Sequence, residues 1–322
     1  MVLKNARVVF YLCTVFIFLS CSALIAQTAD KPQGESSTKT VQDAGEDFRQ
    51  RLHKKITVTE DEYAFGWDSS VIYAPGKSLR AQPGKVSILD TESELSYEFK
   101  VLGGIPIELS LNTEYINIAK NSSLPIYLPA QLTSYGFGAE VTLPFFNLKD
   151  TYLRAKLVPS FFTDHWGATS NSFRLPAQLF LIYRPSEKLI FIAGVASDPG
   201  TENGSILPIA GLIYQPDNKW TFNLVGERPS ITYAITERLS AFVDGGLSDT
   251  EFKISRTEFR GKTLAYKEVH YGGGLQYQVN KNLEAYLSCG RMANRSLKYR
   301  DSLGKVGIKD SIYTQLRLEA DF

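Results

Sequence analysis

The sequence contains little cysteine, histidine or methionine and no excess of charge of one sign. Its 322 residues include three Cys, three His and two Met. Three cysteines in a chain of this length exclude a disulfide framework. The 35 Lys and Arg residues balance the 34 Asp and Glu residues, which argues against a nucleic-acid-binding protein because such proteins need a basic surface.

Long apolar runs are also nearly absent. The mean hydropathy of −0.14 argues against a bundle of membrane-spanning helices, since each would need about 20 apolar residues. It does not argue against a membrane β-barrel, whose strands alternate between apolar and polar residues and average to near zero. Composition therefore leaves a globular chain of one or two domains or a large barrel as the candidate classes.

The one long apolar run predicts an export signal. Lys4 and Arg7 precede the run 8–19, and small residues follow up to Ala26. A basic start, an apolar segment and small residues form a secretory signal peptide, so we predict residues 1–26 as a signal peptide, with Ala29 as the alternative cleavage site. An uncleaved anchor and lipidation at Cys21 remain alternatives, although the residues before Cys21 fit a lipidation box poorly.

Cleavage after Ala26 would leave Cys289 as the single cysteine. We interpret Cys289 as a small apolar side chain on a strand. Residues 27–58 form a polar lead segment, and its first part, 27–40, lacks large apolar side chains and is predicted to be disordered. Within 41–57, apolar residues recur at spacings of three and four, which indicates a short amphipathic helix.

From residue 59 onward the apolar period is two, which predicts strands. The last strand is the clearest example, because its even positions are mostly apolar and its odd positions are polar, up to the terminal Phe322. An alternating strand that ends on an aromatic residue resembles the C-terminal insertion signal of bacterial outer-membrane barrels. On that resemblance, the signal comprises Leu316, Leu318, Ala320 and Phe322.

Turn signals predict the number of strands. Six short connections, near 102–104, 147–150, 185–188, 216–218, 236–238 and 280–281, alternate with seven longer ones at 75–84, 119–130, 164–172, 198–204, 226–229, 249–262 and 295–309. Short periplasmic turns that alternate with long external loops are typical of bacterial barrels. We therefore predict an all-β fold, a transmembrane antiparallel up-and-down β-barrel of about 14 strands over residues 59–322. The count falls to 12 if the weak segments around 219–226 and 230–236 are not strands.

Two stretches resemble a known family. They are residues 184–195 and 207–247, which carry Leu207-Pro208, Gly211-Leu212, Pro216 before Trp220, and Pro229 before Tyr233. The chain resembles an uncharacterised family of bacterial outer-membrane β-barrel proteins, known only as a domain of unknown function, over roughly residues 60–322. The resemblance implies the fold and the outer-membrane location, and it implies no reaction, ligand or site residue.

The polar face of the predicted strands would line the lumen. Acidic residues gather on strands two to four, and basic residues gather on strands five and six. The lumen-lining candidates are Glu92, Glu94, Glu98, Glu108, Glu114, Glu140, Arg154, Lys156, Arg174, Arg184, Arg317 and Glu319. The grouped charges either set a field that selects polar solutes or pair across neighbouring strands and neutralise one another.

Strands seven and eight are apolar on both faces, around 189–196 and 206–213. Such a wall must cover something inside the barrel, and we consider the 41–57 helix, an inward loop and an apolar ligand. A soluble sandwich with both faces buried is the competing interpretation.

Enzymatic motifs are missing from the sequence. There is no HExxH, CxxC, P-loop or GxSxG pattern, and His270 with Ser288 on the next strand is too common a pair to indicate a nucleophile. We predict no enzyme, no cofactor and no metal site. The predicted function is a porin-like passive channel for small solutes, with a closed structural or surface-interaction barrel and a lipid-acting enzyme as alternatives. The predicted partners are outer-membrane lipid and the barrel-insertion machinery, not nucleic acid.

Overall fold

The computed structural model of this chain describes residues 64–80, 83–101, 104–120, 127–146, 148–198, 206–226, 228–255, 259–300 and 303–322. The predicted signal peptide 1–26, the lead segment 27–58 and its helix 41–57 lie outside the described residues. Within the described ranges, no helix is long and apolar enough to cross a membrane.

The described residues form strands and one short 3₁₀ helix. In chain order, the first strands are β1 (Ala64–Arg80), β2 (Lys85–Val101), β3 (Ile105–Lys120), β4 (Gln131–Pro144), β5 (Thr151–Leu157), β6 (Ser160–Thr163), β7 (Phe173–Arg174) and β8 (Ala177–Ser186). The 3₁₀ helix η1 (Ser170–Ser172) lies between β6 and β7. The remaining strands are β9 (Leu189–Ser197), β10 (Ile206–Tyr214), β11 (Trp220–Asn223), β12 (Ser230–Ala234), β13 (Leu239–Lys253), β14 (Thr263–Gln278), β15 (Leu283–Tyr299), β16 (Lys305–Ile308) and β17 (Ser311–Asp321).

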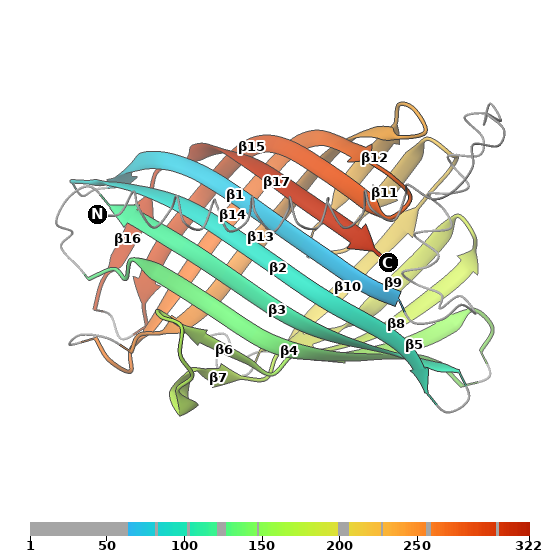
Figure 1. Ribbon diagram of the computed structural model, residues 1–322, viewed down its shortest axis with the longest axis horizontal. Coiled ribbons are helices and arrows are strands. Elements are labelled where there is room, and N and C mark those ends of the chain that lie inside the picture. The colour runs from blue at the N-terminus through green and yellow to red at the C-terminus, as the bar shows by residue number, and fades with distance from the viewer. Residues whose placement is uncertain are drawn as a thin grey trace, which may run out of the picture. The chain divides into compact units, whose positions relative to one another are not determined.

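These strands form a closed antiparallel barrel with 14 positions. Three positions are interrupted strands, because β5 with β6, β7 with β8, and β16 with β17 each occupy one place in the wall. Closure is made by β1, which pairs with β2 on one edge and with β17 on the other (Figure 1). The predicted fold and count are thereby confirmed, and β11 and β12 are strands, which excludes the alternative of 12.

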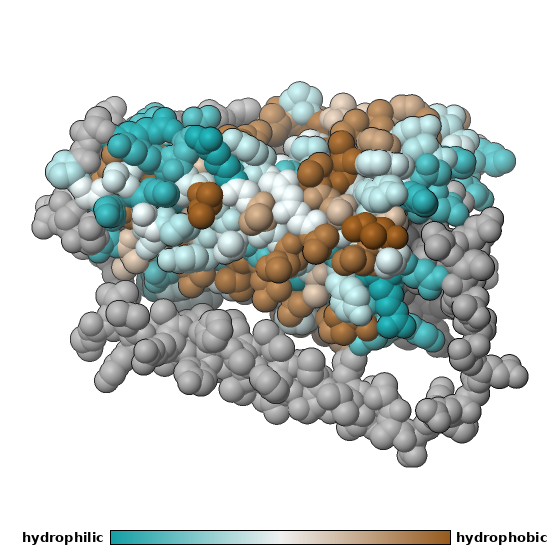
Figure 2. Space-filling view, turned by 90° about the horizontal axis from the view of Figure 1, so that it is seen from above, coloured by the Kyte–Doolittle hydropathy of each residue, from teal (hydrophilic) through white to brown (hydrophobic). Residues whose placement is uncertain are grey.

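Period-two alternation assigns each side chain to one face of the wall. The outward face carries large apolar residues that are well exposed, such as Leu95, Leu111, Phe137 and Leu287. On the face in Figure 2, apolar side chains gather across the middle of the molecule and hydrophilic ones lie towards both ends. An apolar belt between polar ends is what a barrel in a bilayer requires.

The two ends of the barrel differ, and we call them the terminal end and the distal end. The terminal end holds Ala64 and Phe322, whose strands close the barrel through two backbone hydrogen bonds between Phe65 and Phe322. Its hairpins are tight. In one of them Asp217 accepts hydrogen bonds from the backbone N–H groups of Lys219 and Trp220, and these bonds lower the pKa of Asp217.

At the distal end, several strands run further than the sequence pattern predicts. The predicted loop 249–262 contains the end of β13, and the predicted loop 295–309 contains the end of β15 and all of β16. Likewise, β1 continues to Arg80 within the predicted loop 75–84. These loop predictions are wrong at their edges because the inward side chains change from polar to apolar there, so the alternation disappears while the strand continues.

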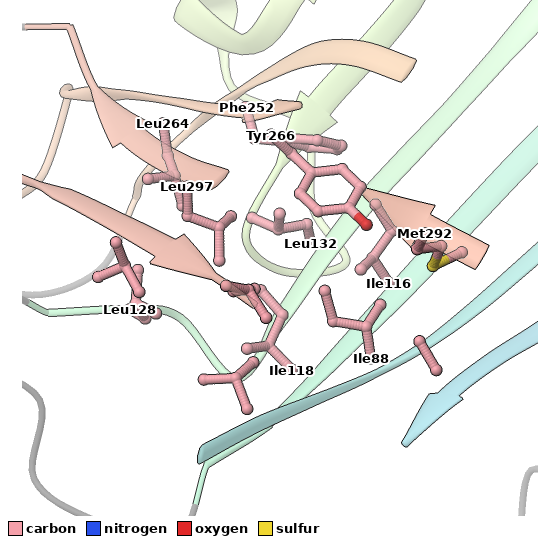
Figure 3. Packing of buried hydrophobic residues seen from close by; sticks show 14 of the residues in the cluster. Ile88, Ile116, Ile118, Leu128, Leu132, Phe252, Leu264, Tyr266, Met292 and Leu297 are labelled. Carbon is pink, nitrogen blue, oxygen red and sulfur yellow. The ribbon is translucent and has the colours of Figure 1, made fainter. Parts of the chain in front are cut away.

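The inward apolar residues of the distal half pack into a core inside the barrel. Figure 3 shows them converging from β2, β3, β13, β14 and β15. The largest fully buried members include Phe252, Leu264, Tyr266, Met292 and Tyr299. Full burial of one such side chain contributes about 1.5–3 kcal/mol. Among the described residues, apolar side chains therefore fill the inside of the barrel in its distal half.

A narrower ring of strands surrounds this core. The β4–β6 pair brings Thr163 of β6 beside Lys253 of β13, so β6 meets β13 directly and lies between β13 and β4 at this level. Strands β8 to β12 do not extend around the distal core. The wall thus has 14 positions at the terminal end and fewer at the distal end.

Glycines on β14 and β15 leave room for a buried tyrosine. Tyr313 on β17 is 1% exposed, and its ring lies over Gly272 and Gly290. A Cβ at Gly272 would stand 2.6 Å from the Tyr313 Oη and 2.6 Å from the Cys289 carbonyl oxygen. These contacts are too short for any side chain, so the close approach requires glycine.

We expect Gly272→Ala to destabilise the barrel by about 1–3 kcal/mol, as overpacking of a tight site does. The measurement is the urea midpoint of the barrel refolded in lipid vesicles. Gly76→Ala is the control, because its Cβ would meet nothing closer than 3.8 Å. Equal midpoints for the two variants would contradict this account of Gly272.

Candidate functional site

The inward face carries a group of carboxylates next to the distal core. Asp90 and Glu92 of β2 and Glu114 of β3 offer oxygens that all lie within 4.8 Å of one another. On β2, Asp90 and Glu92 follow Val86 and Ile88 along the same face, so the inner surface of this strand changes from apolar to acidic at Asp90. Ser134 donates a hydrogen bond to Glu114 at 3.0 Å.

This acidic group has the donor chemistry of a hard-cation site, since carboxylate oxygens are the ligands that Ca²⁺ prefers. Asp90 is 8% exposed, and its Oδ1 has no hydrogen-bond partner among the described residues. However, Arg228 donates to Glu92 at 3.0 Å and supplies one positive charge from the protein itself. The residues that could hold a cation are thus Asp90, Glu92 and Glu114.

A second charge group on the inner face is largely paired. Arg154 of β5 donates two hydrogen bonds to Glu140 of β4, at 2.5 and 2.7 Å. Lys156 lies 3.6 Å from Glu94. The structure therefore brings the predicted acidic and basic walls together as ion pairs, and these four residues neutralise one another rather than opposing each other across an open lumen.

The remaining predicted residues occupy three places. Glu98 and Glu108 stand opposite each other in the β2–β3 register. Arg317 of β17 binds Asp68 of β1 through Nε at 3.1 Å and lies 2.5 Å from Glu319. Arg184 is at the terminal end of β8.

Arg174 differs from the other candidates, because it is 5% exposed and lies at the edge of the distal ring. It donates to Asp198 at 3.0 Å and to the backbone carbonyl of Glu251. Its guanidinium also lies 4.4 Å from the centre of the Phe162 ring. Arg174, on β7, therefore joins the end of β9 at Asp198 to the end of β13 at Glu251.

A cavity of about 170 Å³ lies inside the barrel beside these groups. Most of its lining residues are of polar types, and they come from β1, β11 to β15, β17 and the segment before β12. The lining residues are Ile72, Asn223, Arg228, Ser230, Thr232, Phe242, Asp244, His270, Gln276, Tyr286, Ser288, Gln315 and Arg317. The volume admits a few waters or part of a small solute.

The stretches predicted to be apolar on both faces, 189–196 and 206–213, belong to β9 and β10, and β8 contributes to the cluster on their inner face. On that face Ile182, Ile190 and Ile213 pack together with Phe180 and Val225. Val225 belongs to the segment after β11, so part of this inner face is covered by the barrel's own chain. The suggested 41–57 helix plug lies outside the described residues.

His270 and Ser288 both line the cavity, but they contact different partners. Ser288 donates to Gln315 at 3.4 Å, while His270 Nδ1 lies 3.7 Å from Glu268.

A different Ser, His and Asp group, which the sequence did not reveal, lies at the distal ring. Ser255 Oγ is 2.5 Å from Asp164 Oδ1 and 2.7 Å from His165 Nδ1. In a nucleophilic triad the serine and the aspartate bond to different ring nitrogens. Here Asp164 and Ser255 both face Nδ1, so the group ties the segment after β6 to the end of β13.

The comparisons with known proteins now decide the family. The family model described as "Domain of unknown function (DUF6268)" matches residues 106–312. The chain belongs to this family. No curated protein matches the sequence.

Solved structures similar to this DUF6268 chain are outer-membrane barrels. The COG4313 outer membrane channel from Pseudomonas putida F1 has 10% identity and a TM-score of 0.46, over 82% of this chain and 97% of that chain. The Pseudomonas putida toluene transporter TodX has 10% identity and a TM-score of 0.43, over 82% and 91%. The NanC porin has 11% identity and a TM-score of 0.36, over 79% and 98%.

We expect Glu140→Gln to lower the free energy of unfolding of the DUF6268 barrel by about 1–2 kcal/mol, because the charged Arg154 loses its bidentate partner. Urea titration in lipid vesicles measures the change. The matched control is Asp249→Asn, whose ion pair with Lys267 is exposed on both sides, so its cost should stay below about 1 kcal/mol. A Glu140 variant no less stable than this control would show that the inner pair contributes nothing.

Proposed function

We propose that this protein is an integral outer-membrane barrel that works as a porin-like channel for small solutes. The observation that carries the proposal is a polar cavity, with Arg228, Asp244 and Arg317 in its lining, inside a wall whose outer face is an apolar belt. A polar interior behind a lipid-facing surface is the arrangement of a membrane pore.

In this proposal the terminal end is periplasmic and the distal end is external. An even number of strands places both strand ends of the barrel on one side, and the tight hairpins at that side fit periplasmic turns. Residues 1–26 would be the cleaved export signal. Outer-membrane lipid would contact the apolar belt.

The distal core favours a second candidate, a closed structural barrel without conductance. Among the described residues, the apolar core occupies the distal half from β1 to β16, and its apolar side chains oppose the passage of ions there. The two candidates differ in whether any ion or solute crosses the membrane through the barrel.

Planar-bilayer recording of the purified full chain separates them. We expect small discrete conductance steps from the natural protein. We expect larger steps from the double variant Phe252→Ala with Tyr299→Ala, because both side chains are fully buried in the distal core. A folded barrel that stays silent in both forms would support the closed structural barrel and reject the channel.

We also propose that Leu316, Leu318, Ala320 and Phe322 are read by the barrel-insertion machinery. Their alternation on β17 and the exposed ring of Phe322 support this. Phe322→Ala should lower the amount of heat-modifiable barrel in the outer-membrane fraction several-fold, whereas Phe146→Ala, an exposed aromatic in a hairpin, should not. Equal amounts of heat-modifiable barrel from the two variants would show that Phe322 is not needed for insertion.

A further inference from the structure

The barrel wall is incomplete between β10 and β13. These strands are separated by β11 and β12, which have only 4 and 5 residues, whereas a barrel strand needs about 9–11 residues to cross the hydrocarbon. The neighbouring β13 has 15 residues. The short hairpin therefore closes the wall only at the terminal end.

The edge of β13 shows where the gap begins and ends. Its pairing with β12 stops at Asp244, and Gly245 donates to the Pro229 carbonyl at 3.1 Å. On that edge the next strand pairing is Lys253 with Thr163. Among the described residues, the stretch Gly246–Phe252 thus has no strand partner on this side, which is on the order of 20 Å of strand.

Within the ranges that the structure describes, the facing edge of β10 is open as well. Its pairing with β11 covers Ile213 and Tyr214, and the segment after β11 continues alongside as far as Ile209, where Gly226 lies close to that side chain. Beyond this point stands Pro208, which has no N–H to donate and is tolerated at a strand edge. At the distal side the gap is bounded by the contacts of Arg174 with Glu251 and Asp198.

The hairpin tip turns into the lumen instead of filling the gap. Arg228, at the tip, reaches Glu92 on β2 at 3.0 Å, and Arg228 and Ser230 both line the cavity. The cavity therefore reaches the terminal border of the gap, where Ser230 pairs with Asp244. The ion pair is half exposed on each side, so the tip is held by a contact that water screens.

The rim of the gap lies at the distal border of the apolar belt, with apolar residues on β10 and a change from apolar to polar along β13. Leu247 on β13 is 73% exposed, while the next outward residue, Asp249, forms an exposed ion pair with Lys267. Leu207 on β10 lies on the same inner face as Ile209 and Ile213, yet it is 62% exposed. A lumen-facing leucine with this exposure borders open space.

We propose that this gap is a lateral portal through which small uncharged amphipathic molecules pass between the external leaflet of the membrane and the lumen. The proposal rests on the channel function above and names its route and solute class. An unpaired strand edge is not tolerated in pure hydrocarbon, but it is tolerated beside a water-filled cavity. The distal core narrows the axial route, and the gap is a second opening in the described wall.

The solute class follows from the two surfaces that the solute must cross. The rim presents Leu207 and Leu247 to an apolar body, and the cavity behind it presents Ser230, Thr232 and Asn223 to a polar head. A fully hydrophilic solute would lose its hydration in crossing the apolar belt beside Leu207 and Leu247, and a purely apolar one would gain nothing in the cavity.

Photo-crosslinking to lipid tests the portal in the full chain. Cys13, Cys21 and Cys289 are replaced by serine, and single variants Leu207→Cys, Leu287→Cys and Gln276→Cys are labelled with benzophenone maleimide in phosphatidylethanolamine and phosphatidylglycerol vesicles. Leu287 faces outward and is 62% exposed, so it reports contact with lipid. Gln276 lines the cavity from β14, which is paired on both edges, so it reports the interior behind an intact wall.

We expect mass spectrometry to find lipid adducts at Leu207 at about the level of Leu287 and at least about tenfold above Gln276, because only a gap lets lipid reach an inner-face residue. Added 1-octanol should lower the Leu207 adduct more than the Leu287 adduct, and sucrose should lower neither. Adducts at Leu207 no more frequent than at Gln276 would overturn the portal, and equal competition by octanol at Leu207 and Leu287 would overturn the solute class.

The bilayer recordings separate this proposal from the channel function. Conductance without lipid adducts at Leu207 would support the channel function and reject the lateral route. Adducts at Leu207 in a barrel that stays silent even with the opened distal core would keep the gap in the wall and reject the channel on which the transport route depends.

Discussion

The need to satisfy backbone hydrogen bonds governs this structure. A sheet surrounded by apolar solvent cannot leave an edge unpaired, so the chain returns to its start and β17 pairs with β1. Closure fixes the two faces of every strand, and with them the division between an outward belt of leucines and aromatics and an inward surface of charges. Among the described residues, the facing edges of β13 and β10 escape this rule, and the β13 edge begins beside the cavity described above.

The interior is organised in layers along the barrel. Apolar side chains fill the distal half, a group of carboxylates lies beside them at Asp90, and paired charges such as Arg154 with Glu140 follow. Ion pairs on adjacent strands hold their charges without an external partner, whereas Asp90, Glu92 and Glu114 place three carboxyl groups beside one arginine, Arg228. The carboxyl groups of the acidic layer are therefore not all matched by bases, unlike the pair on β4 and β5.

The fold could be predicted from the sequence because the period of two is a local property. The alternation in 312–322, and the polar turns between strands, were enough to give 14 strands and their faces. The ends of β13 and β15 could not be predicted, since Phe252 and Leu297 lie inside an apolar core whose existence depends on strands far away in the chain. The same holds for the contact of Arg228 with Glu92 and of Ser255 with His165, because no local pattern marks residues that meet across 136 or 90 positions.

The tyrosine over the glycines of β14 and β15 has a consequence for assembly. A one-residue slip between strands exchanges their two faces, and a two-residue slip keeps the faces but moves each side chain one step along its neighbour. Of these registers, the native one places Gly272 and Gly290 under the ring of Tyr313. We therefore expect the final strands to select their alignment through this ring, so that β1 meets an edge whose register is already fixed when the cylinder closes.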